Sequence, residues 1–237
     1  MSSSTWTPRA VASEAARLRI EPWRAVEAQH IASTRRLVDS NEEQGILESV
    51  LEESKPRVPA SIAGLDYLLA TPFRYPPWDR GSRFRSPADP GVLYAADARR
   101  TACAELGYWR WRFVTDSSGL AKLGLGPVAH TLFRMRMTAT GVDLRKKPFL
   151  RDAKAWADRD DYEATQAFAR VVRQTSVTVI RYESVRDPDK GGCVAALDPS
   201  AFAVARPTAY QTWFLTVTPT ASAWQRDREK FEFVWAA

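Results

Sequence analysis

Hydrophobic residues in the first quarter of the chain recur with the spacing of helices. The alanine-rich residues 10–19 could form a short helix, and from Trp23 onward apolar or semi-apolar residues return every three or four positions. Ser40 stands three residues before Glu43, a capping-box pattern at the start of a further helix. We therefore expect residues 1–64 to form a helical N-terminal subdomain that packs on the rest of the chain. The two expected stripes are Trp23, Val26, His30, Thr34 and Leu37, and then Ile46, Leu47, Val50 and Leu51.

From residue 65 to residue 237, which we treat as the main domain, the pattern changes to short apolar or alternating runs between turns. Helices are expected after Asp97, a natural N-cap, and after Asp160 and Asp161. Strands and helices mix without a regular βαβ repeat, which favours an α+β fold over a doubly wound sheet. The expected strands are residues 91–96, 129–138 (alternating, hence half-exposed), 177–182, 193–197, 212–217 and 231–235.

Two segments of the main domain are expected to lack regular structure. Residues 71–85 contain three prolines and a glycine, which forbid a continuous helix and favour extended chain with turns. Residues 141–149 are expected to form a loop.

Composition and charge restrict the kinds of partner. The chain has 237 residues, of which 45% are hydrophobic and 26% charged, as in a soluble globular protein. Its net charge of +6 suits an anionic small molecule or an acidic partner as well as nucleic acid. Because the arginines are scattered and no nucleic-acid motif occurs, we expect no direct binding of DNA or RNA. The chain starts without a secretory signal pattern and has no bilayer-spanning run, so we expect a cytoplasmic protein without a membrane partner.

Several common kinds of site are not supported by the sequence. The two histidines, His30 and His130, lack metal-ligand spacing, and no nucleophile elbow accompanies them. Residues 119–127 are glycine-rich but fit neither the dinucleotide fingerprint nor a P-loop. Cys103 and Cys193 lie far apart without a CxxC motif, so we expect reduced thiols that pack in the core.

A lone carboxylate on an apolar helix face carries the functional interpretation. If the segment after residue 97 is helical, Glu105 shares one face with Ala98, Ala102, Leu106 and Trp109. A carboxylate at such a position is costly unless it is paired or has a chemical task. We therefore take Glu105 as the centre of a candidate active site.

Two arginines and a tyrosine just upstream of Glu105 supply possible partners. Arg74 and Arg83 could hold a pyrophosphate through bidentate hydrogen bonds, and Tyr94 could stack on a planar heteroaromatic ring. One glutamate can stabilise a developing oxocarbenium ion or hold a ribose hydroxyl while the bond to a leaving group breaks. Together these groups describe cleavage of the nicotinamide–ribose bond of NAD, with NAD as substrate and no metal.

An ordered set of motifs in the chain resembles the RES-domain family, which is named for arginine, glutamate and serine residues. The motifs are TPFRYPP, GSRFR, PGVLYAAD, TACAELGYWR and RYESVRDPDKGGCVAALDPSAF. The resemblance extends from about Trp23 to about Trp213, and steps of 11 residues separate Arg83, Tyr94 and Glu105. It implies an ADP-ribosyltransferase-like fold, with a mixed or antiparallel β core and flanking helices.

The resemblance also implies a function and site roles. It implies the toxin of a bacterial type II toxin–antitoxin pair that consumes NAD, with an Xre-type helix-turn-helix antitoxin that blocks the active site. The motif residues fall on Arg74, Arg83, Tyr94, Glu105 and Ser184. Arg83 and Arg74 would hold the pyrophosphate, Tyr94 would stack on nicotinamide, and Ser184 would hold the nicotinamide side or a ribose hydroxyl. Glu105 would be catalytic.

The acceptor of ADP-ribose is left open by the sequence. The length of the chain resembles the ParT-like branch of the family, which transfers ADP-ribose to a protein, whereas other members release it onto water or phosphate. Cys103 occupies the position, two residues before Glu105, where transferases that modify arginine usually carry a second glutamate or glutamine. The alternatives are therefore an NAD glycohydrolase or phosphorylase and, in another class, a non-catalytic nucleotide- or DNA-binding module.

Overall fold

A single sheet of ten strands organises the described part of the protein. The structure is a computed structural model that describes residues 6–28, 39–75 and 81–235. The strand order is β1-β5-β6-β7-β3-β2-β4-β8-β9-β10, and all neighbours are antiparallel except β5 and β6. The strands are β1 (Ala16–Ile20), β2 (Trp23–Glu27), β3 (Leu93–Ala96), β4 (Leu125–Arg134), β5 (Met137–Asp143), β6 (Val179–Glu183), β7 (Gly192–Ala196), β8 (Ala209–Val217), β9 (Ala221–Arg226) and β10 (Glu229–Val234).

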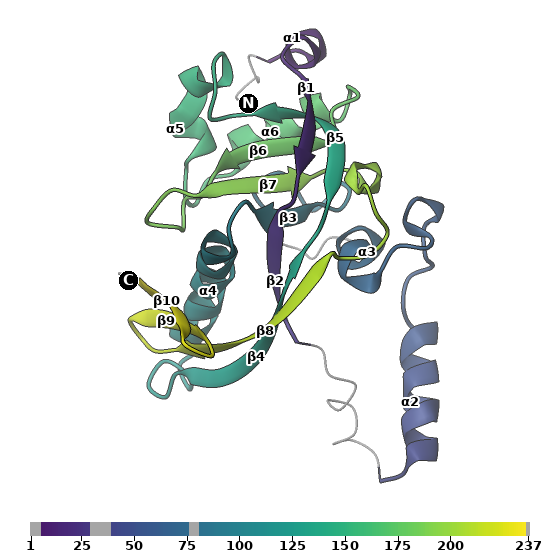
Figure 1. Ribbon diagram of the computed structural model, residues 1–237, viewed down its shortest axis with the longest axis vertical. Coiled ribbons are helices and arrows are strands. Elements are labelled where there is room, and N and C mark those ends of the chain that lie inside the picture. Colours follow the sequence, from purple (N-terminus) through teal and green to yellow (C-terminus); the bar gives the residue numbers. More distant parts are fainter. Residues whose placement is uncertain (1–5, 29–38, 76–80, 236–237) are drawn as a thin grey trace.

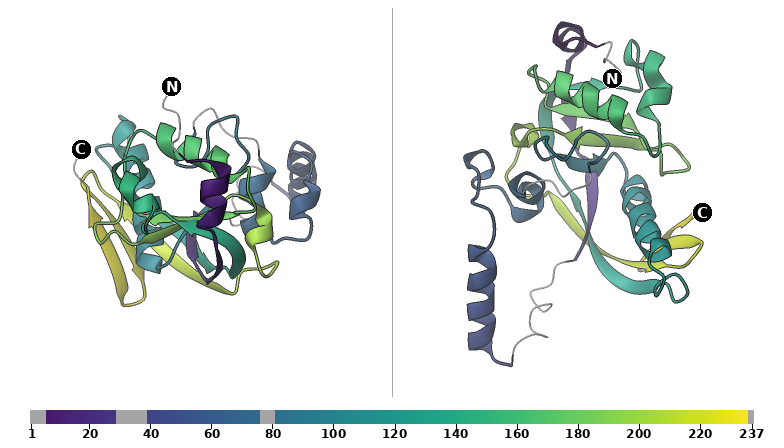
Figure 2. Two further views of the ribbon diagram at one scale, coloured as in Figure 1. Left: turned by 90° about the horizontal axis from the view of Figure 1, so that it is seen from above. Right: turned by 180° about the vertical axis from the view of Figure 1, so that it is seen from behind.

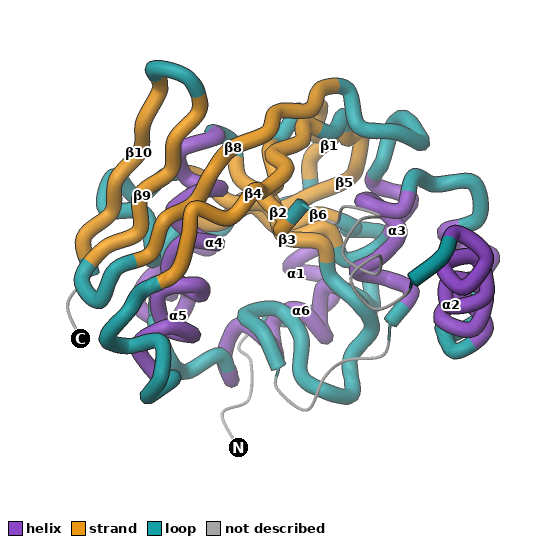
Figure 3. Tube along the Cα trace, turned by 90° about the horizontal axis from the view of Figure 1, so that it is seen from below, coloured by secondary structure: helices purple, strands orange, loops and turns teal. Residues whose placement is uncertain are grey.

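Helices cover both faces of this sheet, which confirms the α+β class. Helices α4, α5 and α6 lie on one side of it (Figures 2 and 3), and α3 packs on the opposite face of β3 and β7. None of the helices in the described ranges is long and apolar enough to cross a membrane. The helices are α1 (Pro8–Ser13), α2 (Asn41–Glu53), α3 (Tyr67–Arg74), α4 (Arg99–Asp116), α5 (Ala153–Trp156) and α6 (Glu163–Val172).

The sheet opens between β2 and β3. Strand β2 pairs with β4 over five positions, but in the described residues the only Cα pair that joins β2 to β3 is Trp23 with Ala96. Beyond this pair the two strands diverge, as Figure 1 shows. Helix α4 follows β3 directly and packs against β2, β8 and β9. The opening and α4 together position the candidate site.

The prediction that residues 1–64 form a helical subdomain is wrong for the first half of that segment. Only Pro8–Ser13 is helical where residues 10–19 were expected to be, and the chain then forms β1 and β2. Strand β1 pairs with all five residues Met137–Gly141 of β5, so hydrogen bonding to distant strands overrides the local helix spacing. The rest of the first stripe, including His30, lies outside the described residues.

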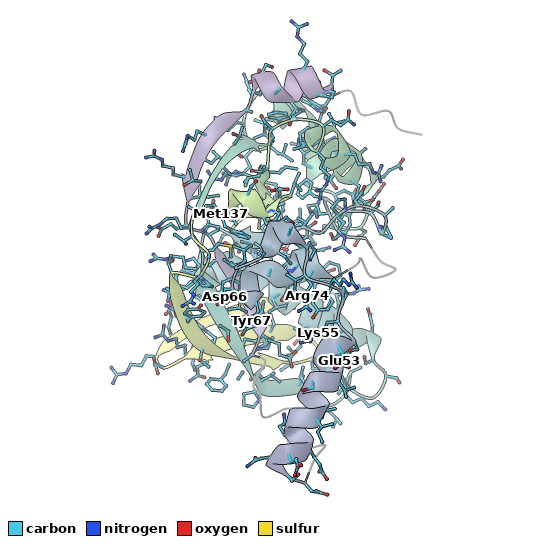
Figure 4. All side chains as sticks on the ribbon, turned by 90° about the vertical axis from the view of Figure 1, so that its right-hand side faces the viewer. Glu53, Lys55, Asp66, Tyr67, Arg74 and Met137 are labelled. Atoms are coloured by element: carbon cyan, nitrogen blue, oxygen red, sulfur yellow. The ribbon has the colours of Figure 1, made fainter. Side chains whose placement is uncertain are left out.

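The second expected N-terminal helix is confirmed as α2, but its packing is not. The Glu43 N–H donates to Ser40 Oγ at 3.1 Å, which is the N-cap bond of a capping box. The Glu43 carboxylate accepts from the Asp39 N–H at 2.9 Å, one residue before the N-cap. Ile46 and Val50 of the apolar stripe are 59% and 56% exposed. Figures 1 and 4 show α2 standing away from the sheet, so this stripe does not pack on the main domain.

Several details of the main domain differ from expectation. Helix α3 continues through Pro72 to Arg74, into the segment expected to lack regular structure. The Asp66 carboxylate caps its start by accepting from the Leu68 N–H at 2.9 Å. Ala98, not Asp97, is the N-cap of α4, and the Asp97 carboxylate instead pairs with Arg181.

The remaining corrections concern strands. The run 129–138 is divided between β4 and β5, and both faces of β4 near Leu132 and Phe133 are buried rather than half-exposed. Strand β5 continues into the segment expected to be a loop, because it pairs with β6 as far as Asp143. Strand β9 was not predicted at all.

Candidate active site

A cavity of about 410 Å³ lies where the sheet opens between β2 and β3. Helix α4 forms one wall, and two loops complete it, residues 81–83 before β3 and residues 185–186 after β6. Its lining combines arginines, aromatic rings and a single carboxylate. The polar and aromatic lining residues are Trp23, Arg24, Ser82, Arg83, Tyr94, Glu105, Trp109, Tyr162, Tyr182 and Arg186.

Glu105 is the carboxylate of this cavity. Ala102, Leu106 and Trp109 of α4 line the cavity with it, so the expected common helix face is the one that faces the opening. Helix α4 is held close to the sheet at Gly107, where an added Cβ would lie 2.6 Å from Ser222 Oγ of β9. This close approach fixes the helix that carries the carboxylate.

The surroundings of Glu105 shift the pKa of its carboxyl group in opposite directions. Its side chain is half-buried, with the exposed part facing the cavity, and loss of solvation in the surrounding protein raises its pKa. A hydrogen bond from Ser184 Oγ to Oε1, at 2.5 Å, opposes this rise, as do the charges of Arg83 and Arg186. The Cys193 thiol also lies 3.7 Å from Oε1. The carboxylate is thus held by donors and cations but is more easily protonated than an exposed one.

Arg83 is fixed by contacts with the α5–α6 region. It is 7% exposed, Nη1 donates to the Trp156 carbonyl at 2.8 Å, and its guanidinium lies 4.8 Å from the ring centre of Tyr162. Thr165 of α6 donates to the carbonyl of Arg83. The arginine therefore presents its charge to the cavity in one orientation.

Tyr94 lies on β3, with its ring in the cavity wall and its hydroxyl tied back into the protein. The Phe84 N–H donates to the phenol oxygen at 2.9 Å, and Ser82 Oγ lies 2.8 Å from the same oxygen. Loss of solvation raises the pKa of the phenol, so it stays protonated at neutral pH. Only the ring of Tyr94 is free to meet a ligand.

Arg24 is a cavity residue that the sequence interpretation missed. It reaches across the opening from β2 and donates from Nη1 to the Tyr94 carbonyl at 2.7 Å. Its Nε is inaccessible to solvent and has no hydrogen-bond partner among the described residues. Burial lowers the pKa of its guanidinium to about 10, which leaves it charged at neutral pH. The sequence interpretation missed Arg24 because it treated residues 23–37 as a helix. Arg24 reaches the cavity because residues 23–27 form a strand that pairs with β4.

Arg186 closes the other side of the cavity. It is 5% exposed, and its guanidinium lies 3.8 Å from the ring centre of Tyr108 and 5.6 Å from that of Trp109. Its Nη2 donates to the Arg159 carbonyl. With Arg24 and Arg83, it makes a strongly cationic environment for one carboxylate.

Two sequence-predicted residues lie outside the lining. Arg74, near the end of α3, donates from Nε to the Pro56 carbonyl at 3.0 Å and does not line the cavity. Ser184 is 1% exposed and stands behind Glu105, so it contacts the carboxylate but does not itself line the cavity. Arg83, Tyr94 and Glu105 are thus brought together, with Ser184 in support and Arg74 apart.

The two cysteines and His130 do not line the cavity. Cys103 packs in the core on the far side of α4, with Trp213 and Trp224. Burial raises the pKa of the Cys193 thiol well above its ordinary value, so it is protonated and a poor nucleophile. His130 contacts the Trp224 ring and does not line the cavity. Among the described residues, no group of three or more histidine, cysteine or acidic side chains could hold a metal ion.

The sequence matches a known family. A sequence model of the RES domain matches residues 57–218, which is more than half of the chain. This chain belongs to the RES-domain family. The resemblance expected from the motifs is confirmed. Arg83, Tyr94, Glu105 and Ser184 all lie inside the matched RES-domain region, whereas Arg24 precedes it.

A similar fold is also found in a solved structure. The chain is similar to one in the "Crystal structure of the M.tuberculosis MbcT-MbcA toxin-antitoxin complex", with a TM-score of 0.50 and 12% sequence identity. The similarity covers 86% of this chain and 87% of that chain. At this identity it shows the fold alone. A search of curated proteins found no match.

Proposed function

We propose that this RES-domain protein is the toxin of a bacterial type II toxin–antitoxin pair and consumes NAD. It cleaves the nicotinamide–ribose bond and transfers ADP-ribose to a cellular protein. The observation that carries the proposal is the pairing of one ionisable carboxylate, Glu105, with three arginines and several aromatic rings around one cavity. This set of groups fits a substrate that has a pyrophosphate and flat heteroaromatic rings.

Binding is assigned to cationic and aromatic groups. Arg83 holds the pyrophosphate, and we assign the second contact to Arg24 rather than Arg74, because Arg24 lines the cavity and stays charged at neutral pH. A charged guanidinium in the wall of a cavity is well suited to a phosphate oxygen. The ring of Tyr94 stacks on nicotinamide. These contacts orient the scissile bond toward Glu105.

Glu105 acts on the bond that breaks. As the C1′–N bond lengthens, both electrons leave with nicotinamide, which departs as a neutral molecule, and positive charge develops on the ribose. The ionised carboxylate stabilises that charge and holds a ribose hydroxyl. A nucleophile then bonds to C1′, and its proton passes to solvent water. Ser184 supports this step by keeping the carboxylate oriented and ionised.

The acceptor is proposed to be a protein side chain other than arginine. A second carboxylate two residues before the catalytic one would serve an arginine acceptor, and Cys103 at that position is turned into the core. Water or phosphate as acceptor would make the protein an NAD glycohydrolase or phosphorylase. A cytoplasmic reaction suits the substrate, because NAD is an intracellular metabolite.

The expected partner is an Xre-type helix-turn-helix antitoxin that covers the cavity. The similarity to a chain from a toxin–antitoxin complex supports such a partner. Because the cavity is cationic, an antitoxin that blocks it would present acidic or polar groups there.

The acceptor is identified by following both products of NAD cleavage, nicotinamide and ADP-ribose. Purified protein is incubated with NAD labelled in its ADP-ribose part, in a cell extract and separately in buffer with and without phosphate. We expect free nicotinamide, and label on a discrete protein band in the extract. Release of nicotinamide without a labelled band would indicate hydrolysis or phosphorolysis, and binding of NAD or DNA without turnover would favour the non-catalytic alternative.

A further inference from the structure

The loop between β6 and β7, residues 184–191, is attached to the helix that carries Glu105. Its two ends are joined by a hydrogen bond from the Ser184 N–H to the Gly191 carbonyl at 2.8 Å. Within it, the Lys190 N–H donates to the Asp187 carbonyl at 2.9 Å. The loop is thus a compact turn that can act as one unit.

The turn fixes the direction of the Ser184 hydroxyl. Its oxygen accepts hydrogen bonds from the Asp187 N–H at 2.9 Å and from the Arg186 N–H at 3.2 Å. A hydroxyl has two acceptor positions and one donor, so both acceptor positions are occupied. The remaining O–H donates to Glu105 Oε1. The hydroxyl therefore acts as a fixed donor to the carboxylate.

Asp187 connects this turn to α4. Its side chain is buried, Oδ2 accepts from Thr101 Oγ1 at 2.8 Å, and Oδ1 pairs with Arg100. Thr101 stands one helical turn before Glu105. An added Cβ at Gly191 would lie 2.1 Å from Thr101 Oγ1 and 2.9 Å from Asp187 Oδ2, so the loop and the helix are in direct contact there.

We propose that Asp187 is a positioning residue for Glu105. By fastening the turn to Thr101 and Arg100, it places the backbone donors that orient Ser184, and Ser184 orients the carboxylate. One helix thus carries both the catalytic group and the attachment of the loop that aligns it. Asp187 does not line the cavity, so its role is one of positioning and not of contact with substrate. The consequence for turnover rests on the proposed function of Glu105.

Asp189 provides a matched comparison in the same loop. Its carboxylate also pairs with Arg100, at 2.9 Å, but its side chain is 70% exposed, against 2% for Asp187. Changing Asp189 removes the same charge without removing the bond to Thr101. The two variants therefore separate the charge near Arg100 from the attachment of the loop.

Four titratable groups face Glu105, and one of them, Arg186, belongs to the turn itself. They are Arg83, Arg186, Tyr182 and Cys193. Without the Ser184 donor the ionised carboxylate is less well stabilised, so its pKa moves upward. The acid limb of the kcat profile then shifts to higher pH.

The experiment measures Asp187→Ala, Thr101→Val and Asp189→Ala in the full chain, by NAD turnover against pH and by NMR titration of the Glu105 carboxyl carbon. For Asp187→Ala we expect a fall in kcat of about tenfold or more from misplacement of the carboxylate, with KM changed less than about twofold. The acid limb and the Glu105 pKa both move upward. Thr101→Val, which keeps the shape of the side chain, moves them in the same direction, and Asp189→Ala leaves both unchanged.

The NMR titration needs no substrate, so it separates the two hypotheses. A wild type that releases no nicotinamide overturns the proposed function, while the titration still tests the positioning role. If Asp187→Ala does not fold, Thr101→Val carries the test. An unchanged Glu105 pKa in the folded variants, or equal effects of Asp187→Ala and Asp189→Ala, overturns the inference.

Discussion

The ionised carboxylate of Glu105, which we propose to be catalytic, destabilises the folded protein. Its folded-state pKa is raised, first by loss of solvation, above the ordinary value of 4.5. A carboxyl group of this kind favours the folded state most at pH values below its unfolded pKa, and this contribution is lost as pH rises through the folded pKa. At neutral pH the ionised Glu105 therefore lowers the free energy of unfolding.

Glu105→Gln is expected to stabilise the protein at neutral pH. Glutamine keeps the shape and can still accept the Ser184 hydrogen bond, but it brings no charge into the site. We expect the Tm at pH 7 to rise by about 2–4 °C, which is what about 1 kcal/mol produces in a chain of this size. At about pH 4 the difference should disappear. A Tm that falls at pH 7, measured by calorimetry or circular dichroism, would contradict the assigned direction of the pKa shift.

At the scale of elements, the position of α4 decides whether the site exists. The helix lies against β9 at Gly107, where an added Cβ would come 2.6 Å from Ser222 Oγ and 3.1 Å from Trp224 Nε1. Ser222 is fully buried, so it has little room to move. The absence of a side chain at residue 107 thus allows the helix to reach the depth at which Glu105 meets Ser184.

Gly107→Ala is expected to destabilise the fold although alanine is the better helix former. Overpacking against Ser222 should lower the free energy of unfolding by about 1–3 kcal/mol. The control is Gly45→Ala in α2, also inside a helix, where nothing lies within 4 Å of an added Cβ. That variant should be neutral or slightly more stable. Equal effects of the two changes in urea unfolding would show that helix propensity, not close packing, governs residue 107.

The elements that could be predicted from the sequence are those with strong local signals. The N-cap bond at Ser40, the apolar runs of β6 and β7, and the helix face around Glu105 all appear as expected. The local pattern predicts helices over residues 10–19 and from Trp23 onward, but β1 and β2 form there instead, and their partners β5 and β4 lie more than a hundred residues away. Arg24 was missed for the same reason.

The candidate site could be predicted in part. Glu105 and Tyr94 carry signals in one short stretch of sequence, whereas the turn that holds Ser184 matters through contacts with α4. The role of Arg74 was assigned from the motif alone. The distance between its α3 helix and the cavity could not be inferred without the fold.

At the scale of the molecule, the sheet extends beyond the matched RES-domain region. Strands β1 and β2 precede residue 57, and β9 and β10 follow residue 218. Strand β2 lies inside the sheet between β3 and β4, and β9 covers the core under α4. The segments outside the match therefore complete both the core and the cavity.

A fragment of residues 57–218 is expected not to fold by itself. Without β2 it loses a central strand together with Arg24, and without β9 it exposes the side of α4 that contacts Trp224. We expect aggregation, or no cooperative thermal unfolding, in contrast to the full chain. A soluble fragment with a sharp unfolding transition would contradict this dependence.

The most direct test of the central claim is nicotinamide release from NAD by wild type, Glu105→Gln and Glu183→Gln. Glu183 is a half-exposed carboxylate on β6 that pairs with Lys190 and does not line the cavity, so it controls for loss of an acidic group nearby. We expect wild type and Glu183→Gln to release nicotinamide at similar rates and Glu105→Gln to be slower by about a hundredfold or more. Full activity of Glu105→Gln, or no release by the wild type, would contradict the account.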